Sequence, residues 1–180
     1  MAVAAYPHVA PNNTNERQHR VQIARAVNYC LSSISDAVLL SVFCTDQFDK
    51  TTVTLSDVTG LSVNLTENRN YRFRAVLYVD ADGTGGHKYA ISGNCTALSV
   101  IYQIDSINNG ANAFVINQRC TALDSSGDEA GATTIRTEIN GFIRVATLGT
   151  LTVQFAQKVA NGTSSILAGS YLIVERIANT

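Results

Sequence analysis

Apolar and polar positions alternate along most of the chain after residue 36, and this pattern predicts β-strands. In the segment 70–80 apolar side chains occupy every second position, with Arg72 and Arg74 between them, and the segment 134–146 repeats the pattern. A period of two is that of a strand with one buried face. The predicted strands, which are separated by turns rich in Gly, Asn, Asp and Ser, are 37–44, 51–56, 60–66, 70–80, 86–92, 97–104, 112–121, 134–146, 149–159 and 168–177.

The segments 149–159 and 168–177 are expected to form a hairpin across a region rich in Gly, Ser and Thr. The first alternates, with Leu151 and Val153 on one face. The second is largely apolar on both faces, which predicts that it is covered on both sides, by its own core or by a second subunit.

This number of short strands predicts a mainly β fold. We expect an antiparallel two-sheet sandwich of the jelly-roll kind, preceded by an extended N-terminal arm and one α-helix. Spacing along the chain does not give the strand order. The expected division is residues 1–35 for the arm and helix and residues 36–180 for the sandwich.

Residues 1–14 contain both prolines and show no periodicity, so we expect an extended arm. A helix is predicted from Glu16 to Ser33, with Asn15 as its N-cap and Gln18 completing a capping box.

An apolar seam on this helix is a candidate oligomer interface. Its members recur at alternating spacings of three and four residues: Ala24, Val27, Leu31 and Ile34. Such a seam is typical of two or three helices that meet along an axis. The alternative is one amphipathic helix lying on its own domain, since so short a helix is too short to stand alone as a coiled coil.

Composition indicates a protein with an ample core and few surface charges. Hydrophobic residues make up 46% of the chain and charged residues 15%, which suggests that part of the surface is hidden in an oligomer or a larger particle. The net charge of −1 and the lack of basic clusters argue against a nucleic-acid partner. No apolar run approaches the roughly 20 residues of a membrane-spanning helix, so membrane insertion is not expected.

No catalytic, cofactor or metal site is expected from the sequence. The cysteines, Cys30, Cys44, Cys95 and Cys120, have no metal-ligand spacing and are interpreted as buried free thiols. Asp80 to Gly83 resembles the start of a calcium loop, but Thr84 stands at the next ligand position and no closing Glu follows, so a tight turn is predicted.

The three histidines lie in separate contexts, so no catalytic triad is expected and the protein is not predicted to be an enzyme. His87 is interpreted as a strand-edge residue. The acidic segment 123–132, with Asp124, Asp128 and Glu129, is expected to be a solvated loop or, alternatively, an exposed contact loop for a receptor or cation.

Several segments together resemble small virion proteins and tail-fibre tips of tailed bacteriophages that carry a C-terminal β-domain. They are GTLTVQFAQ at 149–157, AGSYLIVER at 168–176, NYRFRAVLYVDA at 70–81, GGHKYAISG at 85–93 and the helical QHRVQIARAVN at 18–28.

The resemblance implies a C1q/TNF-like jelly-roll knob that forms a homotrimer in the virion, after assembly in the host cytoplasm. Residues 1–14 would attach it to other virion proteins, and the knob would either contact a host receptor as a short fibre tip or decorate the head. Two alternatives remain open: a free C1q/TNF-like ligand-binding module, and a jelly-roll glycan-acting enzyme, although the sequence shows no clustered His and Glu ligands and no carboxylate pair framed by aromatics.

Overall fold

The computed structural model describes residues 18–27, 39–108, 113–129 and 134–177. The chain divides into two compact units, Met1–Asp36 and Ala37–Thr180. In the first unit the described element is a helix over residues 18–27, inside the predicted range. The predicted arm, the rest of that helix and the predicted boundary at residue 35 lie outside the described residues.

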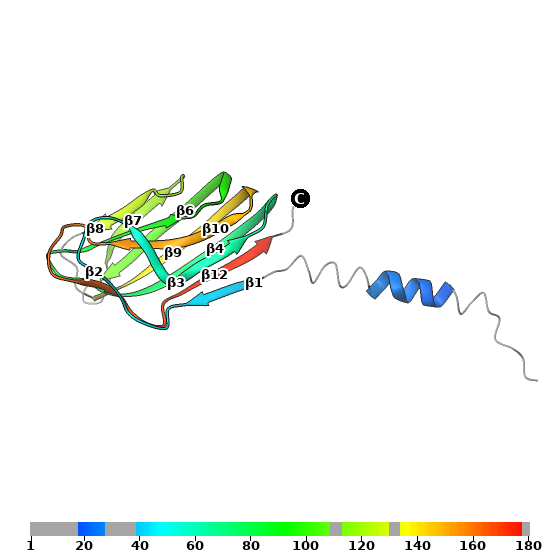
Figure 1. Ribbon diagram of the computed structural model, residues 1–180, viewed down its shortest axis with the longest axis horizontal. Coiled ribbons are helices and arrows are strands. Elements are labelled where there is room, and N and C mark those ends of the chain that lie inside the picture. The colour runs from blue at the N-terminus through cyan, green and yellow to red at the C-terminus, as the bar shows by residue number, and fades with distance from the viewer. Residues whose placement is uncertain (1–17, 28–38, 109–112, 130–133, 178–180) are drawn as a thin grey trace, which may run out of the picture. The chain divides into compact units, whose positions relative to one another are not determined.

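The second unit is built from antiparallel strands in two sheets (Figure 1). The strands are β1 (Leu39–Phe43), β2 (Phe48–Lys50), β3 (Ser56–Leu65), β4 (Arg69–Asp80), β5 (His87–Ser92), β6 (Thr96–Asn108), β7 (Phe114–Cys120), β8 (Ser126–Glu129), β9 (Thr134–Thr147), β10 (Gly149–Ala156), β11 (Ser164–Ile166) and β12 (Tyr171–Ile177).

The pairing of eight of these strands confirms the predicted jelly roll. β1 pairs with β12, β3 with β10, β4 with β9 and β5 with β8, so the chain is folded back on itself in nested pairs. The pairs alternate between the sheets: β1-β12-β4-β9 belongs to the larger sheet and β3-β10-β5-β8 forms the smaller one. This nested arrangement over two sheets is the jelly-roll topology.

The larger sheet is widened by a hairpin. β6 pairs with β9 along almost its whole length, and β7 pairs with β6 at the edge. The short strands β2 and β11 pair with each other, and β11 also joins the end of β4.

The core lies between the two sheets and is filled by alternate side chains of each strand. At its centre the rings of Phe73 and Tyr102 lie 6.3 Å apart. Gly141, on the strand between them, faces inward: a Cβ there would lie 2.4 Å from Phe73 Cζ and 2.6 Å from Tyr102 Cβ. The glycine therefore makes room for two aromatic rings in one layer of the core.

The predicted C-terminal hairpin is wrong. β10 lies in the smaller sheet between β3 and β5, whereas β12 lies in the larger sheet between β1 and β4. The residues between them include β11 and carry the chain from one sheet to the other. A turn-rich segment shows where strands end, but it does not show which partners they take.

Four other strand assignments also differ from the prediction. Residues 51–55 are not a strand, because the chain bends between β2 and β3 there. The short strands β2, β8 and β11 were not predicted, since none has an alternating pattern of its own. β8 and β11 are formed on a longer neighbour, and β2 pairs with β11.

The described cysteines Cys44, Cys95 and Cys120 are free and buried, as predicted, and Cys30 lies outside the described residues. In the part of the chain that the structure describes, no helix has both the length and the apolar character needed to cross a membrane.

Candidate interaction surface

The outward-facing side of β12, β4, β9 and β6 is the candidate site, and we call it the outer face of the larger sheet. Strand register places side chains on it in rows. One row runs Ile173, Arg74, Asn140 and Gln103 from β12 to β6, and the next runs Glu175, Arg72, Phe142 and Ile101. Their sequence neighbours Leu172, Val174 and Phe73 point into the core, so alternation turns these residues outward.

Arginine and glutamate side chains pair across this face. Arg72 Nε donates to Glu175 Oε2 at 2.6 Å. Arg74 donates to Glu138 Oε2 at 3.0 Å, and Arg136 pairs with the other oxygen of Glu138. Burial acts to raise the pKa of Glu138, but the hydrogen bond from Arg74 and the charge of Arg136 outweigh it, so the pKa is lowered. Glu138 is therefore a carboxylate held between two guanidinium groups.

Apolar side chains lie among these charges. Ile173 and Phe142 are half-buried, and Ile101, opposite Phe142, is 41% exposed. At the edge of the same sheet Leu39 is 63% exposed and Phe43 is 61% exposed. Sequence reasoning did not assign these positions to a site. The available signal was an apolar residue where alternation calls for a polar one, as at Ile101 and Phe142.

The smaller sheet has a different outer surface. There the Ser62 and Thr152 hydroxyls are hydrogen-bonded at 2.8 Å, and Gln154 donates to Asp57 at 2.8 Å. These polar groups are hydrogen-bonded to each other within the smaller sheet. The outer face of the larger sheet therefore has the side-chain composition of a protein-binding surface, because arginine and large apolar side chains are enriched where proteins meet.

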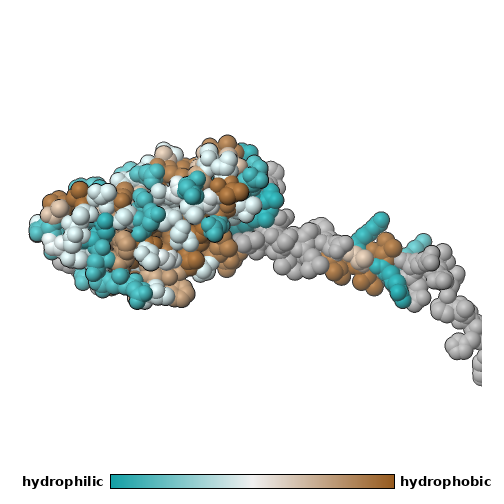
Figure 2. Space-filling model, viewed as in Figure 1, coloured by the Kyte–Doolittle hydropathy of each residue, from teal (hydrophilic) through white to brown (hydrophobic). Residues whose placement is uncertain are grey.

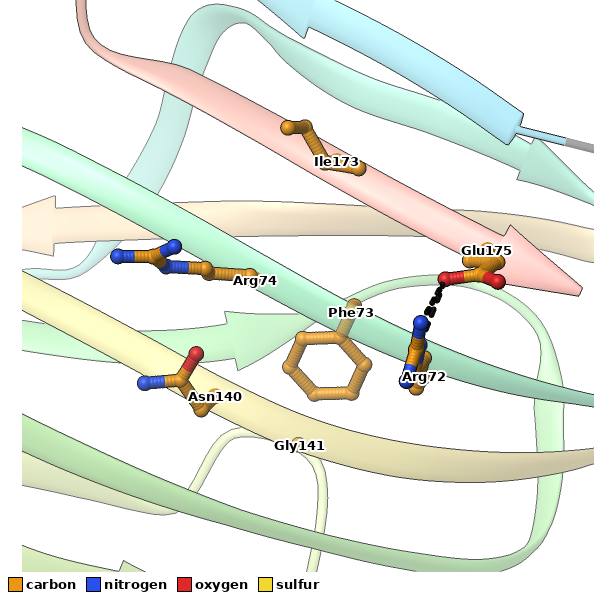
Figure 3. A pocket seen from close by; sticks show the side chains of 7 residues that line it. All are labelled: Arg72, Phe73, Arg74, Asn140, Gly141, Ile173 and Glu175. Atoms are coloured by element: carbon orange, nitrogen blue, oxygen red, sulfur yellow. Dashed lines mark hydrogen bonds and ion pairs between the residues drawn. The ribbon is translucent and has the colours of Figure 1, made fainter.

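One hollow of the outer face, of about 560 Å³, is lined by residues that include Asn70, Phe142 and Arg144. Two smaller hollows lie one on each side of β9. The first measures about 390 Å³ and is lined by Arg72, Phe73, Arg74, Asn140, Gly141, Ile173 and Glu175. In Figure 3 the Arg72–Glu175 pair stands on one side of it, and Arg74 and Asn140 stand on the other. The second, of about 340 Å³, shares Asn140 and Gly141 and reaches Ile101 and Phe142.

The chemistry of the outer face suits recognition. Its side chains offer guanidinium and amide donors, carboxylate acceptors and apolar contact area. Among residues 18–27, 39–108, 113–129 and 134–177 no three His, Cys, Asp or Glu side chains are grouped to hold a metal ion. Figure 2 shows the opposite side of the sandwich, over the smaller sheet, where apolar side chains, in brown, are scattered among polar ones.

The sequence interpretation of His87 as a strand-edge residue is wrong. His87 is completely buried at the start of β5, with its ring 5.3 Å from that of Tyr89. Neither ring nitrogen meets a hydrogen-bond partner among the described residues. Burial lowers the pKa of His87 to about 4, although the charge of Asp128 acts in the opposite direction. The local signal was its alternation with Tyr89 and Ile91, which places His87 on the buried face of β5.

The predicted acidic contact loop is partly a strand. Asp124 lies in an exposed turn with φ of 64°, but Asp128 and Glu129 belong to β8, which pairs with β5. Asp128 Oδ2 lies 3.2 Å from Lys158 Nζ. The side chain of Glu129 is outside the described residues. The segment was mistaken for a loop because its Ser, Gly and Asp residues have low strand propensity, which pairing with β5 overrides.

The turn predicted at residues 80–83 is present. Asp82 Oδ1 accepts hydrogen bonds from the backbone N–H groups of Thr84 at 2.9 Å and Gly85 at 2.6 Å, which closes the turn before β5.

Two residues of the predicted helical seam can be placed. Ala24 and Val27 are exposed on the helix over residues 18–27, whereas Leu31 and Ile34 lie outside the described residues. The oligomer interface at this seam stays a prediction.

Comparison with known proteins gives only distant structural likeness. No protein-family model and no curated protein matches the chain. Among solved structures, the Eiger TNF of S. frugiperda is 9% identical, with coverage of 81% of this chain and 95% of the other and a TM-score of 0.41. Murine APRIL is 11% identical, with coverage of 78% and 99% and a TM-score of 0.41. The tripod from the baseplate of bacteriophage Tuc2009 is 13% identical, with coverage of 74% and 64% and a TM-score of 0.31. At these values the likeness carries no argument about function.

Proposed function

We propose that this protein is a non-enzymatic structural component of a tailed-bacteriophage virion, in which the sandwich forms a homotrimer through the outer face of the larger sheet. One observation carries the self-association: this face combines exposed apolar side chains with arginine–glutamate pairs, whereas the smaller sheet carries short polar groups. The sequence resemblance to phage virion proteins supports the setting.

The charges of the outer face suit a second copy of the same chain. It carries both signs within a short distance, with Arg72 and Arg74 beside Glu175 and Glu138. Arg72 is 67% exposed and Arg74 49% exposed, and such exposed pairs contribute only about 0–1 kcal/mol to a monomer. When two copies of this surface meet, an arginine of one copy can pair with a glutamate of the other. Burial of the surrounding apolar side chains stabilises the contact.

The N-terminal segment has a separate role in this proposal. Residues 1–14 attach the knob to other virion proteins, and the knob either contacts the host as a short fibre tip or decorates the head. Both roles place the protein in the virion.

The oligomeric state tests the interface. Light scattering coupled to size-exclusion chromatography should give about three times the chain mass of 19.3 kDa for the wild type. Ile173→Glu and Phe142→Glu introduce a carboxylate on the outer face and should give the monomer mass, because three buried like charges oppose assembly.

Asn64→Glu is the matched control, because it adds the same charge on the exposed side of the smaller sheet. This variant should keep the wild-type mass. A wild type that is monomeric at micromolar concentration, or outer-face variants that remain trimeric while folded, would exclude this interface.

Cryo-electron microscopy of purified particles tests the setting. Trimeric density at regular capsid positions means head decoration, and density at the tail tip means host contact. Particles that contain no copy of this chain by mass spectrometry would remove the virion role and leave the interface result intact.

A further inference from the structure

His87 is an ionisable side chain sealed inside the sandwich. It is fully buried, both ring nitrogens lack hydrogen-bond partners among the described residues, and its ring contacts Tyr89, which in turn lies 5.5 Å from Phe155. A protonated imidazole at this position would lose its hydration without a compensating hydrogen bond or charge, so burial disfavours the charged form.

The charged and titratable groups around His87 are few. On β8, Asp128 acts electrostatically on His87 but is paired with Lys158, which follows β10. Glu129 occupies the register position opposite His87. In the preceding turn Asp82 accepts two backbone hydrogen bonds.

The rest of the polar surroundings belongs to groups that stay neutral. Burial raises the pKa of Tyr89 above its usual range, while the nearby Thr137 and Ser106 hydroxyls act in the opposite direction. These two hydroxyls are hydrogen-bonded to each other at 2.7 Å, and the Tyr89 hydroxyl has no partner of its own at hydrogen-bonding geometry.

The cover over His87 is weakest at β8. This edge strand makes only four residue pairs, all with β5, whereas β10 on the other side of β5 is held by both β3 and β5. The Lys158–Asp128 pair that ties β8 to the residues after β10 is about 40% exposed, with side-chain values of 39% and 43%. Exposed pairs of this kind add little. Gly127 of β8 also packs against Ile116 and Gln118 of β7, but β8 has only one ladder partner, so it is the neighbour of β5 that can separate more readily.

We propose that His87 is a built-in acid switch: when it takes up a proton, β8 separates from β5 while the rest of the sandwich stays folded. This inference does not rest on the virion role. The partner of the proton is water that enters between the two strands.

The direction of the effect follows from the two protonation states. With β8 in place the pKa of His87 is about 4, whereas the solvated side chain has the ordinary value of 6.5. The open form therefore binds the proton more tightly. The equilibrium constant for opening of β8 is independent of pH above about 6.5. As the pH falls from 6.5 toward 4, this constant rises about tenfold per pH unit.

Hydrogen exchange measured as protection factors tests this behaviour in the full chain. Between pH 6.5 and pH 4.5 the protection of the wild-type amides of residues 126–129 should fall about tenfold per pH unit, because opening is coupled to protonation of His87. Amides of central strand β4, which exchange through global unfolding, should be more strongly protected than those of β8 at every pH, although their protection falls as well, because global unfolding also exposes His87. Lys158→Gln should lower the protection of β8 equally at every pH and leave its slope unchanged.

Two variants remove the titration. In His87→Phe and His87→Gln the protection of the β8 amides should no longer depend on pH over this interval. If either variant does not fold, the imidazole proton signals of the wild type, followed by NMR, give an independent answer. The proposal is overturned by an unchanged slope in a folded variant, by β8 amides that are as strongly protected as those of β4, or by a His87 that titrates near pH 6.5 while β8 stays protected.

Discussion

At the scale of single residues, Gly141 shows how tightly the interior limits the sequence. Its inward side is closed by Phe73 and Tyr102, and the carbonyl oxygen of Ile101 would lie 2.8 Å from an added Cβ. Two of these contacts are with a ring and a side-chain stem inside the core, and the third is with backbone. None of these groups can move away without disturbing the packing of the larger sheet.

Gly141→Ala is therefore expected to destabilise the domain by about 1–3 kcal/mol, the usual cost of overpacking a core. The midpoint of urea unfolding, followed by circular dichroism, gives this value. Asn64→Ala is the control, since Asn64 is exposed on the smaller sheet, away from the outer face, and it should change stability by no more than about 0.5 kcal/mol. Equal stability of Gly141→Ala and the wild type would mean that the two rings are free to move apart.

At the scale of strands, the sequence predicts elements well where one face is buried and the other exposed. The segments 70–80 and 134–146 are observed as Arg69–Asp80 and Thr134–Thr147, because each strand carries its own alternation. β8, with the sequence SGDE, has no apolar residue and exists only because the edge of β5 offers hydrogen bonds. The local sequence pattern does not predict strands of this kind, which form only by pairing with a neighbouring strand.

Pairing and the candidate site were also beyond the sequence, for the same reason. The partners of β10 and β12 are set by how the whole chain folds back, and their residues are far away along it. Ile101 and Phe142 each stand out as apolar residues at exposed strand positions, but only the register shows that they are neighbours. His87 points inward because it lies on the same face of β5 as the buried Tyr89 and Ile91.

A buried polar pair links β6 and β9 and gives a prediction at this scale. The Ser106 and Thr137 hydroxyls lie 2.7 Å apart and both are fully buried. Thr137→Val leaves Ser106 without its partner and should cost about 1–3 kcal/mol. The double variant Ser106→Ala with Thr137→Val should cost less than the sum of the two single variants. Urea unfolding of all four proteins gives the coupling, and additive losses would show that the hydroxyls do not stabilise each other.

At the scale of the whole molecule, two surfaces compete to explain association: the outer face of the larger sheet and the predicted helical seam. If three copies meet along the seam, Leu31→Asp places three like charges on one axis and should dissociate the oligomer. Sedimentation velocity distinguishes monomer from trimer.

Gln22→Asp is the control for this change, since it adds the same charge to an exposed helical position outside the seam, and it should leave the oligomer intact. A Leu31→Asp protein that remains oligomeric, beside an Ile173→Glu protein that does not, would assign the association to the sheet alone.

The entry and exit of the sandwich domain lie at the same end, because Leu39 at the start of β1 pairs with Glu175 near the end of β12 (Figure 1). A force applied between these two ends pulls the strands apart one hydrogen-bonded pair at a time, as in unzipping. A force applied between Leu39 and the turn at residues 81–86, at the far end of β4, instead loads many pairs together in shear. The domain is therefore expected to be mechanically weak when stretched by its own ends and stronger when held at residue 39 and pulled by whatever binds its far end.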